Sequence, residues 1–116
     1  MNDPIKLVQQ EFARLSKGYA RELPKRVLDM ETALQQFLAA PIAGETMDKL
    51  RRQVHQLKGS GATFGFGDIT RVARTFEALL DALARQAAPP SPEQRAQLSR
   101  LTTELRTLAE RARRSA

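Results

Sequence analysis

Apolar residues recur at intervals of three and four along almost the whole chain, the spacing of one face of an α-helix. Five such rows can be traced, and Gly or Pro separates most of them. Val and Ile, which suit strands best, total only seven in 116 residues. The pattern therefore predicts an all-α protein.

The rows also predict the helices and the core. Asp3 is a suitable N-cap and Pro4 a suitable first helical residue. Pro24 should break or kink the chain near Gly18 to Pro24, so a short first helix is expected, then a longer one to about Ala39. The expected core rows, in chain order, are Ile5, Val8, Phe12, Leu15 and Tyr19; Leu23, Val27, Met30, Leu34 and Phe37; Met47, Leu50, Val54, Leu57, Gly61 and Phe64; Ile69, Val72, Phe76, Leu79 or Leu80, and Leu83; and Leu98, Leu101, Leu105, Leu108 and Ala112.

Cap and loop residues set the other boundaries. Thr46 is expected to cap the third helix and Asp68 the fourth. The remaining signals are the loop marked by Pro41 and Gly44, the turn of Gly65, Phe66 and Gly67, the linker Ala87 to Pro90, and the Ser91 and Gln94 capping box before the last helix.

Short loops make neighbouring helices pack antiparallel. We therefore expect one domain over residues 1–116: an antiparallel four-helix bundle with an additional short N-terminal helix. The leucine row of the last helix could instead form a coiled-coil seam between chains, but it spans too few heptads to stand alone. A monomer is the expectation.

Composition excludes several classes of protein. There is no cysteine and only one histidine, so disulfides, thiol catalysis and multi-histidine metal sites are excluded. No apolar run approaches the ~20 residues of a membrane span, and charged residues near the start leave no room for a secretory signal. The expected location is the cytoplasm.

The formal net charge is +6, and fourteen of the nineteen basic residues are Arg. Such an excess favours acidic partners, whether nucleic acid, an anionic membrane or an acidic protein face.

One segment, VHQLKGSGATFGFG from Val54 to Gly67, departs from the helical rules. Gly59 and Gly61 lie within a helical pattern, where each costs about 1 kcal/mol relative to Ala. If Val54 and Leu57 face the core, then His55 shares an outward row with Gly59 and Ala62. An imidazole with small neighbours is open to a docking partner, and Lys58, Arg51 and Arg52 lie nearby.

Phosphoryl capture and release is the chemistry that fits this setting. An ordinary imidazole has a pKa of ~6.5, so its neutral form is a competent nucleophile near pH 7. A nearby ammonium can stabilise phosphoryl oxygens. No cluster of acidic residues is evident near His55, so a partner must supply the metal ion and the acyl-phosphate.

The run His55, Leu57, Lys58, Gly59 and Ser60, followed by Gly65, resembles the H-x-L-K-G-S/A signature of histidine-containing phosphotransfer (HPt) domains. The resemblance covers nearly the whole chain. It implies a helical bundle in which His55 is phosphorylated, Lys58 stabilises the phosphoryl group and Gly59 clears its face. It also implies a carrier without its own enzymatic activity or cofactor. Its partners would be response-regulator receiver domains, which hold the Mg²⁺, and a hybrid sensor histidine kinase.

The sequence departs from the family pattern at two positions. Gly61 stands where the family more often has Ser or Ala, and Glu77 where some relatives have a glutamine near the phosphoryl site. If Glu77 points at His55, its negative charge would oppose an incoming phosphate, so its role is left open.

The expected partner-binding residues are Arg51, Arg52, Ala62, Arg71 and Arg74. Arg71 and Arg74 fit an ordinary solvated face and a surface for an acidic receiver equally well. Two other functions stay open: a basic helical module that binds nucleic acid, and an adaptor scaffold that is not phosphorylated. No helix-turn-helix pattern is recognisable, and the basic residues are spread over every helix, which argues against nucleic acid. The intact His55 argues against the adaptor.

Overall fold

The computed structural model describes residues 3–40 and 44–116, and these fold into four α-helices without a strand. The helices are α1 (Pro4–Ala39), α2 (Glu45–Thr63), α3 (Gly67–Arg85) and α4 (Pro92–Arg114). The all-α prediction is confirmed.

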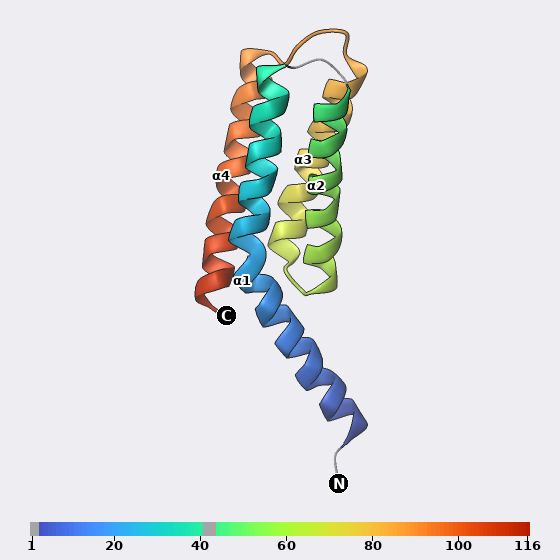
Figure 1. The fold of residues 1–116 in the computed structure, drawn as a ribbon, viewed down its shortest axis with the longest axis vertical. Coiled ribbons are helices and arrows are strands. Elements are labelled where there is room, and N and C mark those ends of the chain that lie inside the picture. Colours follow the sequence, from blue (N-terminus) through green and yellow to red (C-terminus); the bar gives the residue numbers. More distant parts are fainter. Residues whose placement is uncertain (1–2, 41–43) are drawn as a thin grey trace.

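The four helices form an antiparallel bundle in which each helix packs against two neighbours (Figure 1). α1 contacts α2 and α4, and α3 contacts the same two helices. Within the described residues, no helix is both long and apolar enough to cross a bilayer.

The core consists of the inward rows of all four helices. Four of the five rows expected from the sequence supply most of it, from Leu23 of α1 to Leu105 of α4. Phe64, Leu79, Leu101, Leu108 and Ala112 are partly buried at its margin.

The prediction of an additional, separate N-terminal helix is wrong, because α1 runs without interruption through Pro24. Proline removes one backbone hydrogen bond and costs about 3 kcal/mol inside a helix. Here Leu23 and Val27 on either side of Pro24 are buried, and their packing on the bundle holds the helix together. Figure 1 shows α1 bending where it leaves the bundle.

The first apolar row is therefore mostly outside the core. Only Tyr19 is buried, whereas Ile5, Val8, Phe12 and Leu15 are 44–70% exposed on a helix that projects past the end of the bundle. This projection gives the molecule its extents of 63 × 23 × 19 Å.

Two of the four predicted caps are confirmed. Asp3 accepts a hydrogen bond from the backbone N–H of Ile5, and Ser91 and Gln94 form a complete capping box. The prediction of Thr46 as N-cap is wrong because α2 begins at Glu45, with Gly44 at the N-cap. The Asp68 cap is wrong because α3 begins at Gly67; Asp68 lies in the first turn, where its charge complements the helix dipole. Pro41 lies outside the described residues.

A tight turn joins α2 to α3. Gly65 has φ +83, a left-handed conformation that glycine adopts without strain. The N–H groups of Gly65 and Phe66 donate to the carbonyls of Ala62 and Gly61, which is the Schellman ending of a helix. The turn brings the first residues of α3 directly against the last turn of α2.

Candidate functional site

His55 lies in the middle of α2 on the side away from the core. Val54 and Leu57 are buried and fix the rotation of the helix, so the imidazole faces outward. Its side chain is 69% exposed. The exposed position expected from the sequence is confirmed.

The surface around the imidazole is open. A Cβ added at Gly59 would meet no atom within 4 Å, and Gly59 and Ala62 are both exposed. The structure thus brings His55, Gly59 and Ala62 together on one outward row. An incoming domain can reach the ring without displacing a side chain there.

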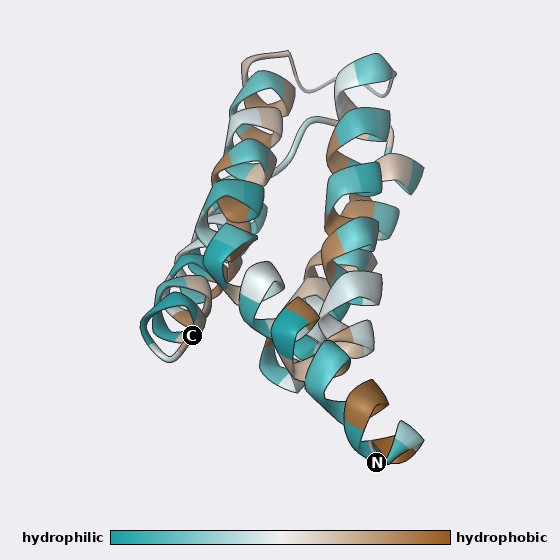
Figure 2. Ribbon diagram, turned by 60° about the horizontal axis from the view of Figure 1, so that its bottom comes forward, coloured by the Kyte–Doolittle hydropathy of each residue, from teal (hydrophilic) through white to brown (hydrophobic). Residues whose placement is uncertain are grey.

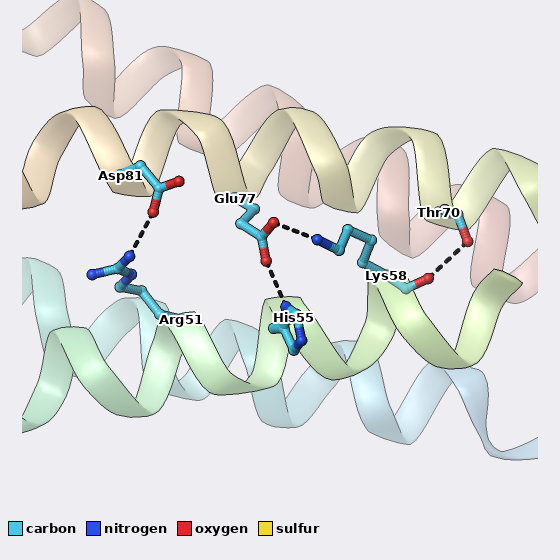
Figure 3. A network of polar contacts seen from close by, with 6 residues as sticks. All are labelled: Arg51, His55, Lys58, Thr70, Glu77 and Asp81. Atoms are coloured by element: carbon cyan, nitrogen blue, oxygen red, sulfur yellow. Dashed lines mark hydrogen bonds and ion pairs between the residues drawn. The ribbon is translucent and has the colours of Figure 1, made fainter. Parts of the chain in front are cut away.

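Glu77 on α3 contacts both His55 and Lys58 of α2 (Figure 3). Its Oε2 lies 2.9 Å from Nδ1 of His55, and its Oε1 accepts a hydrogen bond of 2.6 Å from Nζ of Lys58. The carboxylate therefore points at the imidazole, which the sequence left open.

The charge of Glu77 follows from these contacts. The hydrogen bonds from Lys58 and then from His55 hold the pKa of Glu77 below its usual value, against a smaller effect of burial. Glu77 is therefore ionised at neutral pH and can only accept, so Nδ1 of His55 carries a proton. The lone pair of the neutral ring then lies on Nε2.

A second set of contacts fixes the backbone of α2 next to Lys58. Thr70 of α3 donates from Oγ1 to the carbonyl of Lys58 at 3.0 Å. This approach depends on Gly61, since an added Cβ there would lie 2.7 Å from Thr70 Oγ1 and 3.3 Å from the Phe66 carbonyl oxygen. Gly61 is buried, which confirms its expected place in the inward row.

Ser60, a residue of the motif, lies at the boundary with α1. Its hydroxyl is 2.6 Å from the hydroxyl of Tyr19 and donates to the carbonyl of Gln56. Ser60 therefore joins α2 to α1 rather than extending toward the imidazole.

Arg51 and Arg52 differ in their surroundings. Arg51 donates to Oδ1 of Asp81 on α3 at 2.6 Å, so much of its charge is matched (Figure 3). Arg52 is exposed. Both line a surface hollow of about 490 Å³, whose other walls are His55, Gln56, Glu77 and Asp81.

Arg71 and Arg74 lie on α3 at different positions relative to this hollow. Arg71 pairs with Glu104 of α4 at 3.3 Å, so its side chain turns to α4 rather than to α2. Arg74 is exposed, one turn before Glu77. The structure does not bring Arg71 to the site.

Thr70 and Asp81 are the site residues that the sequence analysis missed. Both lie on the side of α3 that faces α2, at spacings of seven and four from Glu77. That spacing was the available signal, but it becomes informative only once α3 is known to lie beside α2. Within residues 3–40 and 44–116, no group of three His, Cys, Asp or Glu side chains could hold a metal ion.

Fold and site together define an all-α bundle with one exposed histidine, an open surface on one side of it and a matched carboxylate and ammonium on the other. The family model of the Hpt domain matches residues 14–114, so the chain belongs to the Hpt domain family. Members of this family carry phosphoryl groups on histidine in phosphorelays. No curated protein and no solved structure matches the chain significantly.

Proposed function

We propose that His55 accepts a phosphoryl group from the aspartate of a receiver domain and passes it to another receiver. A hybrid sensor histidine kinase stands upstream. The observation that carries this proposal is the state of the imidazole: Nδ1 is occupied by Glu77, while the ring is 69% exposed beside the open face of Gly59. Membership of the Hpt family supports the same reaction.

The transfer step can proceed from the tautomer that Glu77 favours, with the proton on Nδ1 and the lone pair on Nε2. The Nε2 lone pair attacks phosphorus of the aspartyl phosphate, the N–P bond forms and the P–O bond to the aspartate breaks. The aspartate leaves as a carboxylate. The proton on Nδ1 stays in place, hydrogen-bonded to Glu77, and no proton has to leave Nε2.

Lys58 compensates the cost of placing a carboxylate here. Glu77 alone would repel the phosphoryl group, but Nζ of Lys58 lies 2.6 Å from its Oε1 and opposes its charge. On an α-helix, Lys58 is three residues from His55 and projects on the same side. We assign Lys58 to the phosphoryl oxygens as their charge-assisted donor in the phosphorylated state.

In this proposal the receiver brings the aspartate and the Mg²⁺ that polarises the phosphoryl oxygens, and this protein acts as a carrier rather than as an enzyme. The hollow lined by Arg51, Arg52 and His55 is the proposed docking surface, with Ala62 at the other side of the ring.

Nucleic-acid binding is less well supported. Several basic side chains are paired with carboxylates of the same chain, among them Arg51 with Asp81, Arg71 with Glu104 and Arg106 with Glu31. Such pairing weakens the positive surface on which phosphate-backbone binding depends.

The test is phosphotransfer from a receiver labelled by a small phosphodonor. Wild-type protein should take up the label in an acid-labile, base-stable form, and His55→Gln should not. The control is Gln36→Ala, which changes an exposed residue of α1 outside the hollow and should transfer normally. Label on folded His55→Gln protein would overturn the assignment. Receiver binding by wild-type protein without transfer would favour the adaptor.

A further inference from the structure

The projecting part of α1 carries an apolar stripe that is largely exposed. Ile5, Val8, Phe12 and Leu15 are 69%, 70%, 48% and 44% exposed, and they precede the buried Tyr19 on the same face. Figure 2 colours stretches of this helix near the N-terminus as hydrophobic. We call these residues the α1 stripe. Ile5, Val8 and Phe12 precede the part of the chain that matches the Hpt family.

The spacing of the α1 stripe identifies the kind of partner. The intervals from Ile5 to Tyr19 are three, four, three and four, which are the a and d positions of two heptads. A seam this narrow matches a second helix, whereas a membrane surface or a sheet would match a broader apolar face. Leu7, in the same part of α1, is exposed but lies off the seam.

The residues at the edges of the α1 stripe permit self-association despite the net charge of +6. Gln9 and Ser16 border one edge, and Glu11 borders the other. Glu11 is already paired with Arg14 of the same helix. Lys6 and Lys17 lie on the opposite side of the helix, so two copies can meet at their stripes without bringing like charges together.

We infer that two copies of this chain associate through antiparallel packing of their projecting α1 helices. A two-fold axis near residue 10 would place Ile5 of one copy opposite Leu15 of the other and Val8 opposite Phe12, which pairs a with d positions. The two bundles would then lie at opposite ends of the helix pair, where they do not collide. A parallel pair would place both bundles at the same end.

The end of the bundle continues this surface. The Phe12 and Phe64 rings stack with centroids 6.5 Å apart, and Phe64 stacks on Tyr19 at 4.8 Å. Phe64 is only partly buried. The tip of the second α1 would reach these aromatic rings and extend the contact that α1 already makes with its own bundle.

The size of the contact predicts a weak, reversible dimer. Fifteen helical residues span about 22 Å, and a strip about 10 Å wide on each helix gives roughly 450 Å² in total, below the ~1,000 Å² of stable interfaces. His55 lies on α2, nine residues before Phe64, which is about 13 Å along the helix axis. The dimer therefore leaves the histidine face free.

Sedimentation velocity from about 10 µM to about 1 mM tests the inference on the full chain, a range that covers weak dissociation constants. Wild-type protein should move from monomer to dimer over this range. Val8→Glu should stay monomeric and keep its helical circular dichroism and its transfer rate. Leu28→Glu is the matched control, because Leu28 is 59% exposed on α1 but lies outside the α1 stripe; it should dimerise as the wild type does.

Orientation is tested by single cysteines in this cysteine-free chain. Residue 9 lies near the proposed two-fold axis, so in Gln9→Cys the two cysteines of a dimer should form a disulfide between the copies. Ile5→Cys alone should form no such disulfide between copies. When Ile5→Cys and Leu15→Cys proteins are mixed, the two variants should cross-link to each other. Efficient self-cross-linking of Ile5→Cys would overturn the antiparallel arrangement. A monomer at every concentration, or binding of wild-type protein to anionic phosphatidylserine vesicles that Val8→Glu abolishes, would overturn the dimer itself.

Discussion

Oε2 of Glu77 lies 2.9 Å from Nδ1 of His55, while the other oxygen of the same carboxylate holds Lys58 at 2.6 Å. One acidic residue thus sets the tautomer of the imidazole and also positions the ammonium beside it. The charge that would oppose a phosphate on its own is compensated by a residue three positions from the histidine. In the proposed transfer, this relationship makes Glu77 a positioning residue.

The orienting role of Glu77 predicts an ordered series of variants. Glu77→Gln keeps an acceptor for Nδ1–H, so transfer should fall by only a few-fold. Glu77→Ala removes the acceptor and frees the ring, and transfer should fall about tenfold, since a hydrogen bond to a charged group contributes about 1.5 kcal/mol and about 1.4 kcal/mol corresponds to a factor of ten. Stopped-flow transfer measures both. Equal rates for the two variants would show that the acceptor does not matter.

Stability should depend on pH through the same group. The pKa of Glu77 is lowered in the folded protein by its hydrogen bonds to Lys58 and His55, so the folded state favours the ionised form. Its contribution is fully present above the unfolded pKa of about 4.3 and is lost as pH falls through the lower folded value.

Thermal melts of wild type and Glu77→Gln between pH 7 and pH 3 check this dependence. The stability advantage of the wild type should shrink as the solution becomes more acidic. A difference that stayed constant across this range would contradict the linkage.

The two glycines of α2 should respond to alanine with opposite signs. Gly59 faces open space, so Gly59→Ala should stabilise the fold by up to about 1 kcal/mol through helix propensity. At Gly61 an added Cβ would lie 2.7 Å from Thr70 Oγ1, and overpacking of this kind costs about 1–3 kcal/mol. Gly61→Ala should therefore melt at a lower temperature than wild type.

A rescue experiment separates close packing from backbone effects. Thr70→Ala removes the oxygen nearest to the added methyl group, so the Gly61→Ala, Thr70→Ala double variant should lose less stability than the two single changes together. Simple additivity of the two changes would show that the contact with Thr70 is not the cause.

The sequence predicted the parts of the fold and site that depend on local spacing. The all-α class, the core of the bundle and the exposed row of His55 and Gly59 follow from a period of 3.6 residues and from the packing it implies. Pro24 does not break α1, because Leu23 and Val27 around it are buried against the bundle, and local helix penalties alone do not reveal that packing. Glu77 could be placed on its helix, but its contact with His55 depends on how α3 packs against α2.

Access to the imidazole gives a further prediction. Gly59→Glu adds bulk and negative charge one helical turn from His55, on the open face that a receiver would approach. Transfer should fall at least tenfold while the melting temperature changes little. Thr63→Glu, an exposed change one turn further along α2, should transfer nearly as the wild type does. Wild-type transfer by Gly59→Glu would show that glycine is not needed there for access.

The basic side chains near the site should separate by their dependence on salt. Lys58 is 27% exposed and held beside His55 through Glu77, so its contact with the phosphoryl group is only weakly screened. Lys58→Ala should slow transfer, or shorten the lifetime of phosphohistidine, at low and high salt alike. Arg52 is exposed in the hollow next to His55 and would attract an acidic receiver over a distance. Salt screens such long-range attraction, with a Debye length of ~8 Å at physiological ionic strength.

Arg52→Ala should therefore lower the association rate with a receiver, and the deficit should fade as salt rises. Arg71→Ala is the matched control: Arg71 pairs with Glu104 of α4 and should have no effect at either ionic strength. Stopped-flow transfer at two salt concentrations compares the three variants. A Lys58→Ala defect that disappears in high salt would make Lys58 one more steering charge, and an Arg71→Ala defect equal to that of Arg52→Ala would move the docking surface toward α4.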